Sequence, residues 1–356
     1  MLNLTALNRD KMTKNTKKLF VEHLEDRSNP SALGGAELFN GVFFHNFHST
    51  GSDSEGGLAI GGNAQLQHYG IGSPEDGIRD DLVVGGNLNF NSGQLEYGDI
   101  RHGGTANLSS VGFLDGAAAP GTTVDFAALK SQLNHASQFW ASLPATGTTS
   151  VSPWGEISFT GWNSHHNVFT IDASALATAS SLSINVPKCS TVLINVVGEH
   201  VSMSNFGMFL NGTSQAQVLF NMANAKTITM SGIAIQGSIL APKAAISFNN
   251  GHINGTLIGC SFCGNGELHY VKPQLCLPPP PPICGCPSKL TAPTDTSKTT
   301  QTSAVAGFTE VVAPLPSGSE DEATSKTTTT EFVSPRVQNV REFLKRIALS
   351  GGRARS

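Results

Sequence analysis

Short segments that alternate apolar and polar residues recur along the middle of this chain, and many of them contain glycine or asparagine. Three pairs repeat: LAIGGNAQL at Leu58–Leu66 returns as LVVGGNLNF at Leu82–Phe90, VLINV at Val192–Val196 returns as VLFNM at Val218–Met222, and IQGSIL at Ile235–Leu240 returns as INGTLI at Ile253–Ile258. The steps are 24, 26 and 18 residues. Strand-like alternation at such a period is typical of a β-solenoid, in which each coil stacks on the next. We therefore predict an all-β, solenoid body.

One segment has helical rather than strand-like spacing. Between Val124 and Leu143 the apolar positions that share one helical face are Phe126, Leu129, Leu133, Ala136, Phe139 and Leu143. Thr123 or Asp125 can cap the start of this helix, and Pro144 ends it. A single amphipathic helix in a β chain has to bury its apolar face, so we expect it to lie against a sheet.

The residues that close the first two repeats are interpreted as structural turns. They are Gly61, Gly62, Asn63, Gly85, Gly86 and Asn87. The GGN sequence lacks the spacing of a phosphate-binding loop, and we expect the glycines to supply backbone with positive φ. We also predict that Asn63, Asn87, Asn195 and Asn221 lie at coil corners, where stacked side-chain amides satisfy backbone groups.

Composition and charge agree with one large, turn-rich β domain. The chain has 356 residues, 38 glycines and 13% charged residues. Its formal net charge is −4, but Glu37–Glu267 holds 15 acidic and 6 basic residues, which gives −9 for this region. An acidic body repels phosphate backbones, so we expect no nucleic-acid partner.

Four segments follow from these patterns. Residues 1–33 are polar and basic, and we expect an export-type or disordered segment without a long apolar stretch. Residues 36–274 form the solenoid domain. Residues 275–335 are a Cys/Pro neck and a Thr/Ser/Pro-rich linker, for which we expect an extended, disordered chain. Residues 336–356 are a basic amphipathic tail, which either makes peripheral contact with an anionic membrane or is solvated.

Five of the six cysteines gather in a short stretch near the neck. They are Cys260, Cys263, Cys276, Cys284 and Cys286. Their spacing does not match two C-x2-C zinc knuckles, so we predict disulfides of an exported protein, with no connectivity fixed. Cys189 either pairs with one of these or is buried and inert.

Candidate ligand and catalytic residues are few. Asp53, Glu55, Asp80 and Asp81 could supply oxygen ligands for calcium, but we favour the alternative that they cap turns, and we predict no cofactor. The histidines of HNFH (His45–His48) and the pair His165–His166 lack the spacing of a hydrolytic zinc site. No Gly-x-Ser-x-Gly elbow is present, so we predict no catalytic residues.

The order of several motifs resembles a known family. LFNGVFFHNF, SDSEGGLAIGGNAQL, LVVGGNLNF, the helix and finally VLFNMANAKTITMSGIAIQGSILAPKAAISFNNGHINGTLIGCSFCGNGELH are similar to the choice-of-anchor A family, an ice-binding-like adhesive domain of bacterial surface proteins. This resemblance covers Glu37 to about His269. It implies a right-handed parallel β-solenoid with a helix packed alongside, and surface display or adhesion rather than catalysis. PLPSG at Pro314–Gly318 departs from the Leu-Pro-x-Thr-Gly sorting signature that some surface proteins carry.

Two functions of different classes remain. The first is a non-catalytic, secreted adhesive or matrix module at the bacterial cell surface, with a surface glycan, matrix or another cell-surface protein as partner. The alternative is a polysaccharide-active β-helix lyase or hydrolase, which needs paired carboxylates such as Asp53 and Glu55 or Asp80 and Asp81. Ice binding is not favoured, because Thr227–Thr229 (TIT) is nearly the only element of a threonine ladder. We expect the adhesive module, because basic groups for uronic-acid chemistry are scarce.

Overall fold

The structure, a computed structural model, describes residues 32–72 and 80–282. The chain divides into two units, Met1–Pro287 and Ser288–Ser356. The predictions for the export-type segment before Ala32, for Cys284 and Cys286, for the linker and for the basic tail lie outside the described residues.

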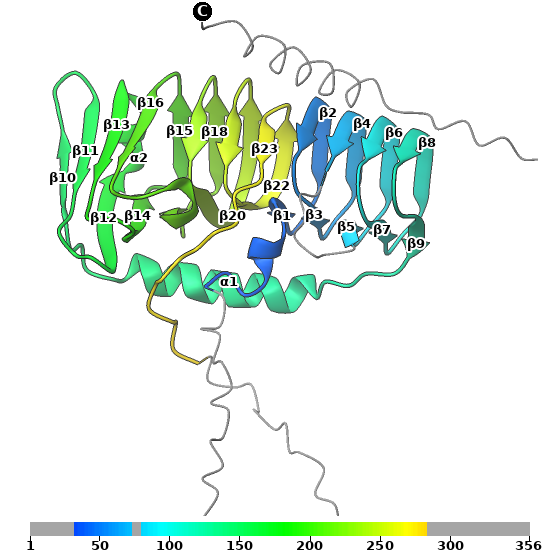
Figure 1. The fold of residues 1–356 in the computed structure, drawn as a ribbon, viewed down its shortest axis with the longest axis horizontal. Helices are drawn as coiled ribbons and strands as arrows, with labels where there is room; N and C mark the ends of the chain where they lie inside the picture. Colours follow the sequence, from blue (N-terminus) through cyan, green and yellow to red (C-terminus); the bar gives the residue numbers. More distant parts are fainter. Residues whose placement is uncertain (1–31, 73–79, 283–356) are drawn as a thin grey trace, which may run out of the picture. The chain divides into compact units, whose positions relative to one another are not determined.

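The body is a coiled parallel sheet with three faces (Figure 1). Its first face is a ladder of ten parallel strands, which are in spatial order β9 (Ala118–Pro120), β7 (Asp99–His102), β5 (Asp80–Val84), β3 (Leu58–Ile60), β1 (Gly41–Phe43), β22 (Leu257–Gly264), β20 (Ser238–Asn249), β17 (Val218–Asn221), β14 (Thr191–Val197) and β12 (His166–Asp172).

The second face contains the first part of β8 (Ala106–Phe113), β6 (Leu88–Leu95), β4 (Ala64–Ile71) and β2 (Phe47–Ser54), then the later parts of β22 and β20, and β18 (Thr227–Ser231) and β15 (His200–Ser204). The third face contains the ends of β8, β6, β4 and β2, followed by β23 (Glu267–His269), β21 (His252–Asn254) and β19 (Ala234–Gln236). A separate sheet of β16 (Gly207–Asn211), β13 (Ser181–Asn185), β11 (Glu156–Thr160) and β10 (Thr148–Val151) forms one end of the body.

The helices are few. The long helix α1 spans Phe126–Ala141, the short helix α2 spans Ala173–Ala177, and two 3-10 turns cover Ala36–Leu38 and Gln215–Gln217. α2 follows β12 directly and packs against β15. The prediction of a parallel β-solenoid with one long helix alongside is confirmed.

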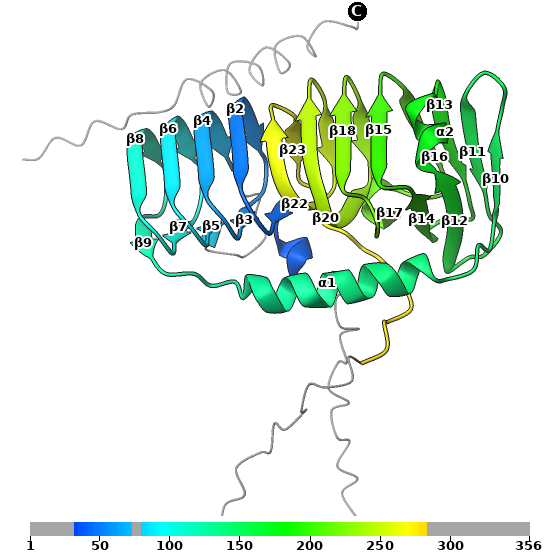
Figure 2. The same ribbon diagram turned by 180° about the vertical axis from the view of Figure 1, so that it is seen from behind.

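The coils are not stacked in the order of the sequence. The first strand, β1, lies near the middle of the body, and the coils that follow it extend outward to β9 (Figures 1 and 2). Helix α1 then runs along the body toward the other end. There the β10 hairpin starts a second set of coils that returns toward the middle. The last coil of this set contains β22, which pairs with both β1 and β2. The first and the last coil therefore meet in one sheet.

The three sequence repeats are confirmed as coil registers. Leu58 pairs with Leu82 across β3 and β5. Val192 pairs with Val218, and Ile235 pairs with Ile253, on neighbouring strands. Each step of 24, 26 or 18 residues is therefore the length of one coil of this solenoid.

Helix α1 lies on the outer side of the first face. Asp125 is its N-cap, with the carboxylate accepting a hydrogen bond from the Ala128 amide at 3.0 Å. Leu129, Leu133 and Ala136 are buried against the strands, as the helical spacing predicts. Trp140, which the sequence pattern did not single out, is also buried in this contact, and its indole N–H donates to the Pro278 carbonyl at 2.9 Å.

The glycine pairs do form a corner, but the expected reason is wrong. Gly61, Gly62, Gly85 and Gly86 are not among the glycines with positive φ. They are required because neighbouring coils approach closely: a Cβ on Gly85 would lie 2.5 Å from the Gly61 carbonyl oxygen. Positive φ occurs instead at the bend between the second and third faces, at Gly51, His68, Ser92, Ser110, Asn205, Gly232 and Asn250.

The asparagine prediction is half right. At the corner, the Asn63 side-chain oxygen accepts from the Asn87 amide at 2.8 Å, and Asn87 in turn accepts from the Thr105 amide. Asn195 and Asn221 lie instead inside strands β14 and β17, buried under α1. Their side-chain amides donate to the carbonyls of Trp140 and Ser137, respectively, at 2.9 Å, so they satisfy carbonyls at the end of the helix.

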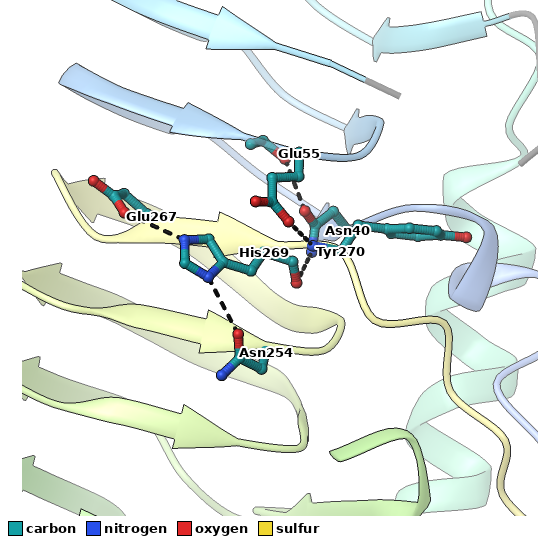
Figure 3. Close-up of polar contacts among 7 residues, drawn as sticks. Asn40, Glu55, Asn254, Glu267, His269 and Tyr270 are labelled. Carbon is teal, nitrogen blue, oxygen red and sulfur yellow. Dashed lines mark hydrogen bonds and ion pairs between the residues drawn. The ribbon is translucent and has the colours of Figure 1, made fainter. Parts of the chain in front are cut away.

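Asn40 joins the first coil to the last (Figure 3). Its side-chain nitrogen donates to the carbonyls of Gly255 at 2.7 Å and His269 at 3.2 Å. Its side-chain oxygen accepts from the Gly56 amide at 3.1 Å and from the Ser54 hydroxyl at 3.2 Å. Asn40 is fully buried, and all four hydrogen-bonding positions of its side-chain amide are used. Two of these bonds cross the junction between the first and last coils, and the other two hold the loop after β2.

We expect Gly86→Ala to lower the free energy of unfolding by about 1–3 kcal/mol, because the new methyl group meets backbone that cannot move away. A Cβ at Gly86 would lie 2.4 Å from the Asn63 side-chain oxygen and 2.7 Å from the Gly62 carbonyl. The control is Gly112→Ala, whose nearest atom lies 3.9 Å away, with an expected change within about 0.5 kcal/mol. Equal urea midpoints for the two variants would contradict the close-approach explanation.

We expect Asn40→Ala to lower the free energy of unfolding by about 2–4 kcal/mol, because it leaves buried backbone groups without their partner. Asn249→Ala, at an exposed position on β20, should change it by less than about 0.5 kcal/mol. Thermal and urea unfolding followed by circular dichroism measures both. A small effect at Asn40 would mean that the junction depends on the strands alone.

Candidate binding face

Strict alternation separates the two sides of the second face. On β2, Phe47 and Ser49 are buried, while His48 and Thr50 are exposed. The same pattern holds on β4, β6 and β18, where the inward residues join the core. Since side chains on a strand point to opposite sides in turn, every second residue of this face projects into solvent.

The outward residues form continuous rows because the strands are in register. The middle row crosses eight strands and consists of Asn107, Asn89, Gln65, His48, Cys263, Ser247, Thr229 and Ser202. With strands about 4.8 Å apart, this row is about 34 Å long. A single β-sheet of this extent offers a broad, regular surface.

On the parts of the strands that lie in this face, no outward position carries a formal charge; the exposed Lys243 of β20 lies at the corner just before that part. Beside the middle row lie a row that includes Ser109, Asn91, Gln67 and Thr50 and one that includes Ala245, Thr227 and His200. The nearest charged pair stands at the rim, just before β18 and β15, where the Lys226 ammonium lies 2.8 Å from Glu199. The hydrogen bond and the charge of Lys226 lower the pKa of the exposed Glu199 carboxyl.

Hydrogen bonds between coils hold the face in place. The Asn46 side-chain oxygen accepts from the Asn63 amide at 3.0 Å and so continues the corner ladder of Asn63 and Asn87. On the face itself, the His200 ring nitrogen lies 2.8 Å from the Thr227 hydroxyl. These contacts fix the outward groups before any ligand binds, which reduces the entropy lost on binding.

The four carboxylates considered for calcium or for catalysis do not form one site. Asp80 pairs with Arg101 at 2.8 Å, and Asp81 is buried beside it on β5. Asp53 and Glu55 lie at the end of β2, on the third face, where Glu55 accepts a hydrogen bond from the Tyr270 amide at 3.0 Å. Within residues 32–72 and 80–282, no group of three or more His, Cys, Asp or Glu is arranged to hold a metal ion.

The cysteines of the described part are free thiols. These are Cys189, Cys260, Cys263 and Cys276. Cys189 is exposed, so the alternative that it is buried and inert is wrong. The disulfide prediction now depends on Cys284 and Cys286, which lie outside the described residues, and it stays a prediction.

Two motifs that were considered separately in the sequence lie on neighbouring strands. HNFH and CSFC stack in register, with Phe47 beside Phe262 and His48 beside Cys263. The two phenylalanine rings stack at 4.7 Å inside the core, while His48 and Cys263 face solvent. Their matching spacing in the sequence was a signal that could have predicted this pairing.

A pair of histidines, His252 on β21 and His269 on β23, lies on the third face near the junction. Figure 3 shows His269 with its partners Asn254 and Glu267. The rings of His252 and His269 stack at 4.4 Å. The ring nitrogens of His269 lie 3.2 Å from the Asn254 side-chain oxygen and 3.3 Å from Glu267. Partial burial lowers the pKa of His252, and the charge of His269 lowers it further.

One comparison with known proteins identifies a family. A family model described as "Putative Ice-binding-like adhesive domain" matches residues 32–270, about two thirds of the chain. The crystal structure of an ice-binding protein from the Antarctic ascomycete Antarctomyces psychrotrophicus is 12% identical, with 67% of this chain and 97% of that chain covered and a TM-score of 0.31. No curated protein matches the sequence. Among the described helices, none is both long and apolar enough to cross a membrane.

The histidine pair predicts a pH dependence of stability. Because the pKa of His252 is lowered in the folded protein, the unfolded chain binds its proton first as the pH falls through the ordinary value of 6.5. The contribution of neutral His252 to the free energy of unfolding is therefore fully present above pH 6.5. It decreases as the pH falls below 6.5 toward the lowered pKa of the folded protein. Urea unfolding from pH 7.5 to 5 should show this decrease, and His252→Gln should reduce it whereas His48→Gln should not. An unchanged pH profile in His252→Gln would contradict the prediction.

Proposed function

The chain belongs to the putative ice-binding-like adhesive domain family, and from this premise we propose that it is a non-catalytic adhesive module displayed at the cell surface. Its contact surface is the second face, and its ligand is a solid that presents an array of uncharged hydroxyl groups, such as a neutral polysaccharide. The observation that carries the proposal is the outward row across eight strands, in which six of the eight residues are Asn, Gln, Ser or Thr, the other two are His48 and Cys263, and no Asp, Glu, Lys or Arg occurs.

The chemistry of the face suits such a ligand. Amide and hydroxyl groups both donate and accept hydrogen bonds, as sugar hydroxyls do. Burying them against a neutral surface requires no desolvation of ions, which is the largest penalty in a polar interface. Many weak contacts over a rigid face add up to a firm attachment without a deep pocket.

The path of the C-terminal segment agrees with display. After β23, residues 271–282 pack on α1 and the first face: Leu277 is buried there, and the Pro281 carbonyl lies 2.7 Å from a His135 ring nitrogen. The Cys276 amide donates to the Thr191 hydroxyl at 2.9 Å. No described segment covers the outward side of the second face (Figures 1 and 2). The last described residues therefore lie on α1 and the first face rather than on the second face.

The composition of the rows favours a polysaccharide over ice. The middle row contains eight residues of six types, including His48 and Cys263, and Thr229 is its one threonine. Ice presents a single repeating lattice, which a face of identical small groups matches better than this mixture does. Ice is therefore kept as a separate arm of the test.

The test places a charge at the centre of the face. We expect Ser247→Lys to weaken binding to insoluble cellulose or chitin at least tenfold, because the ammonium has to be desolvated against a neutral surface. Ser131→Lys, on the exposed side of α1, is the matched control and should bind as the unmodified protein does. Depletion assays with each solid measure both variants.

The outcomes distinguish a polysaccharide ligand from ice and from binding at another surface. Binding to polysaccharide that Ser247→Lys alone weakens supports the proposal. Uptake into growing ice that this substitution abolishes, without polysaccharide binding, would assign the face to ice instead. Equal binding by both lysine variants would show that the second face is not the contact surface.

A further inference from the structure

Three large aromatic side chains are exposed around the sheet of β10, β11, β13 and β16 at one end of the body (Figure 1). Trp154 is 76% exposed, Trp162 is 70% exposed, and Phe209 is 60% exposed. The third tryptophan of the chain, Trp140, is 1% exposed. Aromatic side chains gain stability by burial, so three exposed ones around one small sheet require an explanation.

Trp154 is presented by a rigid turn. It lies in the hairpin between β10 and β11, in the sequence Ser152-Pro153-Trp154-Gly155. The Gly155 amide donates to the Ser152 carbonyl at 3.0 Å, and the Glu156 amide donates to the Ser152 hydroxyl at 3.0 Å. Proline before Trp154 and a glycine with φ of 82° after it fix the backbone on both sides.

Trp162 follows the other end of β11, and hydrogen bonds fix the backbone on both sides of it. The Gly161 amide before it donates to the Asn185 carbonyl at 3.0 Å. After it, the Asn163 amide donates to the Asn167 side-chain oxygen at 3.0 Å, and the Asn167 side-chain nitrogen returns a bond to the Asn163 carbonyl at 2.8 Å. Asn167 is fully buried. A buried side chain therefore fixes the loop that exposes this tryptophan.

The surface between these aromatics is polar and nearly neutral. Phe209 is an outward residue of β16, and in register with it lie Ser183 on β13, Ser158 on β11 and Ser150 on β10. The next row contains Asn211, Asn185, Thr160 and Thr148, and the Asn211 amide donates to the Asn185 side chain at 2.9 Å. Glu156 is the only charged residue in these four strands.

The spacing is that of an extended ligand. Trp154 and Trp162 flank β11 and are eight residues apart, so their separation is at most about 26 Å, the length of a fully extended chain. Phe209 lies two strands from β11, or about 10 Å to the side. The site is too long for one small molecule and too neutral for a nucleic acid or an anionic polymer.

We propose that this end sheet is a second binding site, separate from the second face, which takes a neutral polysaccharide chain. The tryptophan rings stack on the C–H faces of sugar rings, and the serine, threonine and asparagine rows exchange hydrogen bonds with the sugar hydroxyls. Both loops are fixed in advance, so binding orders little of the protein. The proposal concerns soluble single chains and does not require that the second face binds a solid.

Tryptophan fluorescence tests this site directly, because Trp140 is buried and the two exposed tryptophans dominate any response to a ligand. Titration of the full chain with soluble neutral hexasaccharides of glucose and of N-acetylglucosamine should give a saturable blue shift with at least one of them. Trp154→Ala and Trp162→Ala should each weaken this binding at least tenfold, and Trp162→Phe should recover part of it. Tyr97→Ala, which removes an aromatic that is 56% exposed elsewhere on the surface, is the matched control.

Unchanged emission with both sugar series would overturn the proposal, as would a blue shift that all variants retain. A shift that Ser247→Lys removes and the tryptophan variants retain would assign the binding to the second face instead. Oligosaccharide binding that survives Ser247→Lys, together with a loss of adhesion to solids, would show that the two sites act separately. Because all three aromatics are exposed, the variants should unfold at the midpoint of the unmodified protein, and circular dichroism checks this.

Discussion

The pairing of the last coil with the first is the interaction on which the rest of the structure depends. Gly41–Phe43 on β1 pair with Leu257–Gly259 on β22, across more than 200 residues of sequence. Phe47 stacks on Phe262 beneath this ladder, and Asn40 ties both coils to the loops beside it. Without this junction the body would be two short solenoids, each with an additional open edge. The row of outward groups on the second face is continuous only because it crosses from His48 to Cys263 at this point.

Helix α1 makes the junction possible. Its 16 residues extend about 24 Å, and they carry the chain from β9 toward the opposite end, from which the second set of coils can return. Two contacts fix the helix on the sheet. Its apolar stripe packs against the strands, and the side-chain amides of Asn195 and Asn221 donate hydrogen bonds to carbonyls near its C-terminal end. The same helix receives the C-terminal segment through Trp140 and His135. One element therefore sets the order of the coils and the side on which the chain leaves the body.

Both proposed binding surfaces are faces of a rigid sheet. In a coiled parallel sheet the core is filled by inward side chains, while the outward rows and the corner loops lie at the surface. The second face offers neutral hydrogen-bonding rows, and the end sheet adds fixed aromatic rings to the same kind of row. Both suit neutral, hydroxyl-bearing polymers, and together they would let one module hold a solid and a single chain.

The sequence by itself determined everything that depends on neighbouring positions in a coil. Its periods matched the observed registers, and its helical spacing located α1 with Thr123 or Asp125 as the cap, of which the structure selects Asp125. Strand alternation separates Phe47 and Leu66 inside from His48 and Gln65 outside. The sequence located the corner at the glycine pairs, but it did not show why glycine is needed there. A carbonyl group of the neighbouring coil approaches these glycines, and a local sequence pattern does not show this contact. Only the tertiary structure decided the order of the coils, the role of Asn40 and the place of Asn195 and Asn221. Coils of similar length and alternation can stack in several orders, and the choice depends on contacts between residues that are far apart in the chain and have no common period.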